Sequence, residues 1–235
     1  MKIFLKLVVL SLVLISCNES RDNIKQYSIE TLMTNNRSSG GYFSKDANKL
    51  IYSSDKSGIF NIYEVDLENN EETQITDSKE ESFFVRGYSP STREVIYSAD
   101  VGGNENSHIF IIRDGNSIDL TPGENTKASF FGWTDNELEM YVISNSRDPR
   151  FFDLYKVDIE TLSSRMVYKN DSGYNLNSIS NNDKYLVLSL NLSRSEQKLF
   201  LYNVNSKQQV EISNQVANFS GQNFDKNDEN YFYTT

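Results

Sequence analysis

Charged side chains that suit molecular recognition gather in two short segments, residues 100–107 and 145–152. The residues concerned are Asp100, Glu105, Arg147, Asp148 and Arg150. An arginine can hold a carboxylate through two parallel hydrogen bonds, so the two segments have the chemistry to pair with each other. Two interpretations stay open: a local network of ion pairs that orders two loops, or a docking surface for a peptide or another protein domain.

Residues for catalysis or metal binding are scarce. His108 is the single histidine and Cys17 the single cysteine, so neither a His-based triad nor a His/Cys metal centre has enough members. No serine lies in a Gly-x-Ser-x-Gly context. Residues 225–229 alternate oxygen-bearing side chains as a calcium loop does, but the required Gly and the distal Glu are missing, which favours a hairpin turn. We therefore expect no catalytic, cofactor-binding or metal-binding residue in this chain.

The elements that position these residues follow a regular repeat. A polar residue preceded by a large apolar one recurs at intervals of 45, 45, 46 and 45 residues. The five anchors are Ser44, Ser89, Thr134, Ser180 and Asp225. Apolar residues stand six and eight positions after each anchor, and this period-2 spacing indicates a strand behind a hairpin turn. A period that regular indicates one supersecondary unit, repeated.

Each unit holds further strand patterns. Third strands are predicted at residues 61–66, 109–112, 153–158 and 199–204, and fourth strands at 74–76, 119–121, 165–167 and 211–213. Four short strands in about 45 residues match one blade of a β-propeller. The predicted fold is all-β: four complete blades and the start of a fifth, which reaches only its second strand at residues 231–235. This pattern favours part of a larger propeller; a five-bladed ring closed by residues 27–32 is the alternative.

The N-terminus resembles a bacterial lipoprotein signal. Lys2 and Lys6 precede an apolar run over residues 7–15, and Leu-Ile-Ser leads directly to Cys17. The run is too short to span a membrane. We expect a signal peptide at 1–17 with lipidation of Cys17, a polar tether at 18–41 and the propeller at 42–235. The alternative is an ordinary secretory signal with an incidental cysteine. Lipidation would place the chain in the cell envelope, on the periplasmic side or at the outer membrane.

Composition limits the partners. The chain has 33 acidic and 23 basic residues, a net charge of −10 at pH 7. A polyanion would be repelled, so nucleic acid is not an expected partner.

Four segments carry a family resemblance: residues 100–108, 119–123, 131–133 and 144–155. The last reads Ser-Asn-Ser-Arg-Asp-Pro-Arg-Phe-Phe-Asp-Leu-Tyr and is the most specific. Together they resemble the N-terminal β-propeller of bacterial serine peptidases of the prolyl oligopeptidase family, such as dipeptidyl and acylaminoacyl peptidases. The resemblance covers residues 42–235. The repeat itself is shared with TolB-like propellers.

The resemblance implies that this chain is the substrate-gating and docking part of a lipid-anchored peptidase, whose catalytic α/β-hydrolase domain would be separate from these residues. Its partners would then be a peptide substrate or that hydrolase domain, with the membrane contacted through the lipid. Two other hypotheses remain. One is a stand-alone TolB-like lipoprotein that binds a protein or peptide. The other is a propeller whose central channel binds a sugar or another small molecule, as in a lyase, but the sequence lacks the clustered His and carboxylate metal site expected for it.

Overall fold

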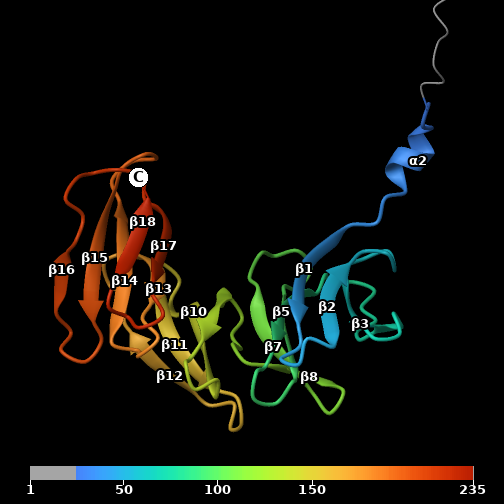
Figure 1. Cartoon of the computed structure of the whole chain (residues 1–235), viewed down its shortest axis with the longest axis horizontal. Helices are drawn as coiled ribbons and strands as arrows, with labels where there is room; N and C mark the ends of the chain where they lie inside the picture. Colours follow the sequence, from blue (N-terminus) through green and yellow to red (C-terminus); the bar gives the residue numbers. More distant parts are fainter. Residues whose placement is uncertain (1–24, 235) are drawn as a thin grey trace, which may run out of the picture. The chain divides into compact units, whose positions relative to one another are not determined.

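The computed structural model describes residues 25–234, and the chain divides into two compact units, Met1–Asn36 and Arg37–Thr235. The described part of the first unit holds one short helix, α2 (Ile29–Met33), which is labelled in Figure 1. The hydroxyl of Ser28 caps it by accepting a hydrogen bond from the backbone N–H of Thr31 (3.2 Å). Residues 27–32 were a candidate closing strand, and that prediction is wrong because the cap and Glu30 in the first turn favour a helix. The signal peptide and Cys17 lie outside the described residues.

The second unit consists of consecutive antiparallel sheets, which we call blades 1 to 5 in chain order (Figure 1). Blade 1 comprises β1 (Ser38–Phe43), β2 (Lys49–Ser54), β3 (Asn61–Asp66) and β4 (Glu72–Gln74). Blade 2 comprises β5 (Phe84–Tyr88), β6 (Val95–Ala99), β7 (His108–Arg113) and β8 (Asn116–Asp119). Blade 3 comprises β9 (Ala128–Trp133), β10 (Glu139–Asp148), β11 (Phe151–Asp158) and β12 (Ser164–Tyr168). Blade 4 comprises β13 (Asn175–Ile179), β14 (Tyr185–Asn191), β15 (Gln197–Asn203) and β16 (Gln209–Glu211).

The fifth sheet has two described strands, β17 (Ser220–Phe224) and β18 (Tyr231–Thr234). Four complete blades and a partial fifth confirm the fold class expected from the repeat. Residues 38–41, which the sequence assigned to the tether, belong to β1 and hence to blade 1. No helix in residues 25–234 combines the length and the apolar character needed to cross a bilayer.

The turn that joins the first two strands of each blade explains the repeat. The anchor side chain accepts backbone hydrogen bonds within its own turn, as Thr134 Oγ1 does from the N–H of Glu139 (3.2 Å) and Ser180 Oγ does from the N–H of Tyr185 (2.8 Å). Each turn also contains one residue with left-handed backbone angles, φ between 58° and 62°. These residues are Ala47, Arg93, Glu137, Asp183 and Asp228. A side-chain acceptor and a left-handed residue together stabilise a tight turn. Because every blade has this turn at the same place, the anchor residues recur at a constant spacing.

Three of the four fourth strands lie earlier in the chain than predicted. In the structure β4, β8 and β16 end at Gln74, Asp119 and Glu211, the first residues of the predicted triplets. The reason is a side chain that replaces a ladder carbonyl: the hydroxyls of Thr76, Thr121 and Ser213 accept the backbone N–H of the neighbouring third strand at 2.9, 2.9 and 3.2 Å. The regular strand therefore ends at the first residue of each predicted triplet, although the next residue, Ile75, Leu120 or Ile212, still donates its backbone N–H to a third-strand carbonyl oxygen.

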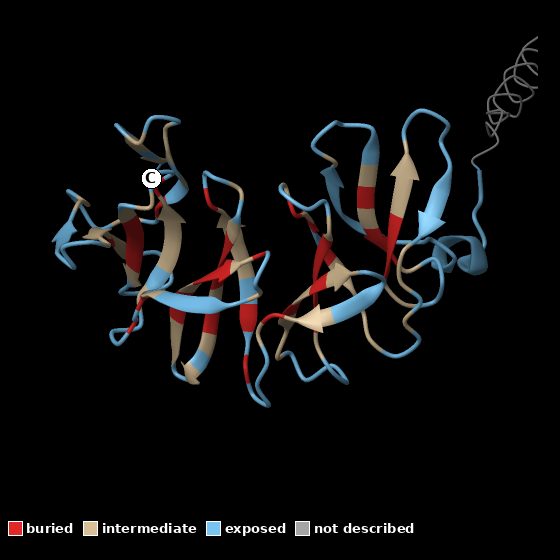
Figure 2. Ribbon diagram, turned by 90° about the horizontal axis from the view of Figure 1, so that it is seen from below, coloured by how far each residue is buried: buried red, intermediate tan, exposed pale blue. Residues whose placement is uncertain are grey.

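Buried residues lie along the strands of the blades (Figure 2), and they pack into cores between successive blades. Ile51 and Ile62 of blade 1 pack with Val85 and Tyr97 of blade 2. The core between blades 2 and 3 contains Ile96, Ile109, Ile111, Met140 and Val142, and the core between blades 3 and 4 contains Tyr141, Leu154, Leu186 and Leu188. Full burial of such a side chain contributes about 1.5–3 kcal/mol. The blades are thus stabilised by burial against their neighbours, blades 2 and 3 on both faces.

Candidate functional site

The segment 145–152 of blade 3 is a β-hairpin and not the loop that the sequence predicted. β10 continues to Asp148, β11 begins at Phe151, and these two residues are paired in the antiparallel register. Only Pro149 and Arg150 lie between them. The carboxylate of Asp148 accepts hydrogen bonds from Arg150 Nε (3.0 Å) and Nη2 (2.7 Å). The Arg150 guanidinium therefore holds the pKa of the Asp148 carboxyl well below its ordinary value.

Arg147 is held within its own hairpin. Its Nε and Nη2 donate to the two carboxylate oxygens of Asp153 at 2.6 and 2.9 Å, and its Nη1 lies 3.2 Å from a carboxylate oxygen of Asp171. The Asp153 side chain is fully buried, so this is a bidentate pair in a poorly solvated setting. The predicted pairing of Arg147, Asp148 and Arg150 with Asp100 and Glu105 is wrong, because the hairpin supplies nearer partners.

Asp153 also belongs to a buried network that joins blade 3 to the segment leading into blade 4. It accepts the backbone N–H of Asn170 (2.7 Å). The side-chain amide of Asn170 donates to the carbonyl oxygens of Phe152 (3.1 Å) and Tyr174 (2.7 Å), and its oxygen accepts the backbone N–H of Tyr174 (3.1 Å). Asn170 is 1% exposed, so these bonds fix the hairpin against the connecting segment.

A hollow of about 360 Å³ lies between the two parts that Asn170 joins. The hairpin side contributes Ile143, Arg150, Phe151 and Phe152 to its lining. The side of the connecting segment and β13 contributes Asn170, Gly173, Tyr174, Asn175 and Leu176. An apolar lining with a few polar groups is typical of a site for a small ligand or a peptide side chain. We call this feature the hairpin hollow.

The two other predicted residues, Asp100 and Glu105, order the β6–β7 loop. Asp100 Oδ2 accepts the backbone N–H of Glu105 (3.0 Å), and Glu105 has a left-handed φ of 60°. In the same loop, the N–H of Gly102 donates to both carboxylate oxygens of Glu81 (2.9 Å each). Among the described residues, neither Asp100 nor Glu105 forms an ion pair with the blade 3 hairpin. They belong to the structure of their own loop.

His108 begins β7, one residue before the predicted third strand at 109–112, and its Nδ1 lies 2.7 Å from Oδ2 of Asp119 on β8. Its ring also stacks beside Phe110, with 6.3 Å between the ring centres. Residues 25–234 contain no group of three or more His, Cys, Asp or Glu placed to hold a metal ion.

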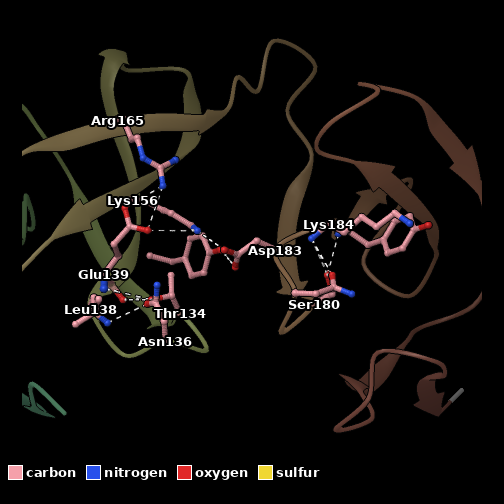
Figure 3. Close-up of polar contacts among 12 residues, drawn as sticks. Thr134, Asn136, Leu138, Glu139, Lys156, Arg165, Ser180, Asp183 and Lys184 are labelled. Atoms are coloured by element: carbon pink, nitrogen blue, oxygen red, sulfur yellow. Dashed lines mark hydrogen bonds and ion pairs between the residues drawn. The ribbon is translucent and has the colours of Figure 1, made fainter. Parts of the chain in front are cut away.

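A second polar cluster, which the sequence pattern did not predict, joins blades 3 and 4 (Figure 3). Lys156 of β11, whose side chain is 6% exposed, donates to the carboxylate of Asp183 on blade 4 and lies 3.6 Å from Glu139 on β10. Tyr141 donates its phenolic hydrogen to Asp183, and Arg165 pairs with Glu139 (2.9 Å). The pKa of the Tyr141 hydroxyl is raised by its burial and by the Asp183 carboxylate. The sequence feature that could have predicted this cluster is Lys156, a charged residue between the apolar residues of a predicted strand.

Comparisons with known proteins place this geometry in context. No family model matches the chain. A stretch of 136 residues, 55% of the chain, is 29% identical to dipeptidyl aminopeptidase BIII of Pseudoxanthomonas mexicana and covers 19% of that protein. The resemblance to this class of peptidase is confirmed.

Solved structures share the fold. A prolyl endopeptidase structure superposes with a TM-score of 0.62 at 16% identity, over 83% of this chain and 31% of the other. TolB of Acinetobacter baumannii superposes with a TM-score of 0.53 at 19% identity, over 80% of this chain and 46% of the other. The fold is a β-propeller of the type found in TolB and in prolyl endopeptidases. The chain spans less than half the length of each of these proteins.

Proposed function

We propose that the chain is the non-catalytic propeller portion of a lipid-anchored serine peptidase of the prolyl oligopeptidase family, and that it docks peptides. The hairpin hollow carries this proposal. It lies beside the Arg-Asp-Pro-Arg-Phe-Phe-Asp segment on which the family resemblance is strongest, and it has an apolar lining with preset walls. The sequence similarity to a dipeptidyl aminopeptidase supports a peptide as the ligand. Catalysis would belong to an α/β-hydrolase domain, which is also a candidate docking partner.

Binding of short peptides to the full chain tests the docking function. Isothermal titration calorimetry with a mixed set of short peptides should show saturable binding. An Arg150→Gln or a Phe152→Ala exchange should lower the affinity. A fluorophosphonate probe should leave the chain unlabelled, because its sequence lacks a nucleophile elbow. If no peptide binds, the docking proposal fails; covalent labelling would contradict the non-catalytic assignment.

The alternative is a stand-alone TolB-like lipoprotein that binds a protein or peptide partner, which the superposition on TolB supports. The reading frame after Thr235 distinguishes the two proposals. A continuation through a Gly-x-Ser-x-Gly elbow supports the peptidase, and a stop codon supports the binding protein.

Lipid anchoring in the cell envelope is proposed from the Leu-Ile-Ser-Cys sequence that ends at Cys17. When the gene is expressed in a Gram-negative host, the protein should partition into the detergent phase, and Cys17→Ala should release or misprocess it. An unchanged partition of the variant would show that Cys17 is not lipidated.

A further inference from the structure

The charge of the hairpin hollow is carried by a single group. Among the residues that line it, Arg150 alone is charged, and its neighbours Phe151, Phe152 and Tyr174 are aromatic. The chain as a whole has a net charge of −10, so an anion has no general reason to approach it. A preference for a negative ligand at this place would have to come from Arg150 itself.

We propose that the hairpin hollow binds the free C-terminal carboxylate of a peptide whose last residue has a bulky apolar side chain. This inference rests on the peptide-docking function proposed above and specifies which end of the peptide is bound.

The guanidinium of Arg150 is oriented for this role. Asp148 accepts hydrogen bonds from its Nε and Nη2, which fixes the plane of the group. Its Nη1 forms no hydrogen bond with any described residue. The Arg150 side chain is 75% exposed, so its guanidinium retains donor capacity for the carboxylate of a ligand, in a solvated setting. Asp148 would act as a positioning residue.

The charged and apolar groups of the hollow are adjacent. The guanidinium carbon of Arg150 lies over the Phe151 ring, 5.1 Å from its centre. The apolar group of a ligand would therefore contact other lining side chains, such as Phe152, Tyr174 and Leu176. A ligand that uses both parts must present an anion beside an apolar group. A C-terminal residue is the arrangement in which one residue supplies both, through its α-carboxylate and its side chain. An Asp or Glu followed by a bulky apolar residue is the competing arrangement, and it is included in the test.

The size and rigidity of the hollow fit a chain end. A volume of about 360 Å³ is near the lower end of ligand sites, which suits one bulky residue with its carboxylate. The buried amide of Asn170 already binds the carbonyl oxygens of Phe152 and Tyr174 on the two walls. Little ordering is then required when the ligand enters.

The test is calorimetric titration of the full chain with acetyl-Ala-Ala-Phe carrying a free carboxylate, and with the same peptide as its C-terminal amide. The acid should bind about threefold to fivefold more tightly, as expected for one ion pair with an exposed guanidinium. Arg150→Gln should abolish this preference. Lys169→Gln, in which a neighbouring exposed cation outside the hollow is removed, should retain it. Circular dichroism confirms that both variants are folded.

Three results would overturn the inference. The acid and the amide bind equally well, the preference for the acid falls equally in Arg150→Gln and Lys169→Gln, or the affinity is unchanged when the terminal Phe of the peptide is replaced by Ala. An amidated acetyl-Ala-Glu-Phe that binds as tightly as the acid would also overturn it, since its charge is on a side chain. If neither Phe-ended peptide binds but other peptides do, only this inference fails. If no peptide of any kind binds, the docking function fails with it.

Discussion

Lys156 shows how one side chain distinguishes one blade interface from the others. Its strand position corresponds to Glu64 in blade 1, Ile111 in blade 2 and Leu201 in blade 4. Glu64 reaches the next blade by accepting the hydroxyl of Tyr88 (2.7 Å), whereas Ile111 packs in an apolar core. Lys156 instead needs a carboxylate from blade 4, so its interface contains a charge that must be compensated.

Asp183→Asn tests the dependence of Lys156 on this carboxylate. The change keeps the side-chain shape and a residue that tolerates the left-handed turn, but it removes the nearest negative charge from a buried ammonium group. Because the Asp183 side chain is 38% exposed, we expect a loss of about 1–3 kcal/mol in the free energy of unfolding, below the value for a fully buried pair. Urea denaturation measures the change.

The matched control is Asp77→Asn, which removes a carboxylate from the exposed pair with Lys79. Its effect should stay within about 0.5 kcal/mol. Equal effects of the two variants would show that Lys156 does not depend on Asp183.

Glu94 should contribute to the acid sensitivity of the fold. Its pKa lies below the ordinary value of 4.5, chiefly because of its hydrogen bonds with Arg113, which also donates to the carbonyl oxygen of Ile159 in blade 3 (2.6 Å). A carboxyl with a lowered folded-state pKa stabilises the fold above its unfolded-state value, and this contribution is lost as the pH falls through the folded-state value. Glu94→Gln should therefore lower Tm at neutral pH and make its decline below about pH 4.5 shallower.

Thermal melts of the wild type, Glu94→Gln and the exposed-site control Glu124→Gln over this pH range measure the effect. The control curve should parallel that of the wild type. A Glu94→Gln curve that is also parallel would contradict the assignment.

At the scale of elements, the sequence repeat correctly predicted the features that are set by hydrogen bonds within a few residues, namely the first turn and the second strand of each blade. The anchors are the residues that accept hydrogen bonds inside their own turns, so their spacing located the turns and the second strands correctly. The ends of the fourth strands were missed because Thr76, Thr121 and Ser213 use hydroxyls in place of backbone groups. Strand propensity alone cannot show where a side-chain hydroxyl replaces a backbone carbonyl as the hydrogen-bond acceptor.

The candidate site was predicted in part for a related reason. The sequence located the Arg-rich segment, but assigning it to a loop hid its cross-strand neighbours. In the hairpin register, Ser144 pairs with Asp153 and Asp148 pairs with Phe151, which brings Arg147 beside Asp153. Asn170 contributes because the segment between blades 3 and 4 passes beside the hairpin, and the sequence contains no pattern that predicts this path.

The turn at Ala47 offers a test of this local chemistry. Its φ of 58° is unfavourable for a residue with a Cβ, and the residue is exposed. Ala47→Gly should raise the free energy of unfolding by up to about 1 kcal/mol, because glycine adopts this conformation without the steric cost. Thermal and urea denaturation measure it.

Ala128 in β9 provides the opposite case, since it is 3% exposed and lies in a strand. There the same exchange should destabilise by about 1 kcal/mol through lost packing and greater chain entropy. Destabilisation by both exchanges would contradict the strain assigned to the Ala47 turn.

At the scale of the whole propeller unit, each of blades 1 to 3 packs against a complete four-stranded blade that follows it, whereas blade 4 is followed by the two described strands of blade 5. Blade 5 contributes β17 and β18 to this contact, and Gln222 of β17 accepts a hydrogen bond from Asn177 of β13 (2.6 Å). Farther out on blade 4, Leu201 and Val210 line an open hollow of about 460 Å³. The corresponding Ile111 of blade 2 is fully buried. The outer flank of blade 4 thus exposes apolar side chains, Leu201 and Val210, among polar ones, and exposed apolar groups favour association in water.

We therefore expect a polypeptide of residues 18–235 to self-associate and to bind a hydrophobic dye. Size-exclusion chromatography and dye fluorescence measure this, and Val210→Lys should reduce both signals because Val210 is 58% exposed on the open flank. Val101→Lys is the matched control: this valine is 70% exposed on the β6–β7 loop, away from the flank, and its exchange should change neither signal. A five-bladed ring, which would have to be closed by a strand other than the segment that forms α2, predicts the opposite behaviour. A monodisperse polypeptide with a sharp cooperative melt would favour that closed form, and with it the stand-alone binding lipoprotein over the peptidase portion.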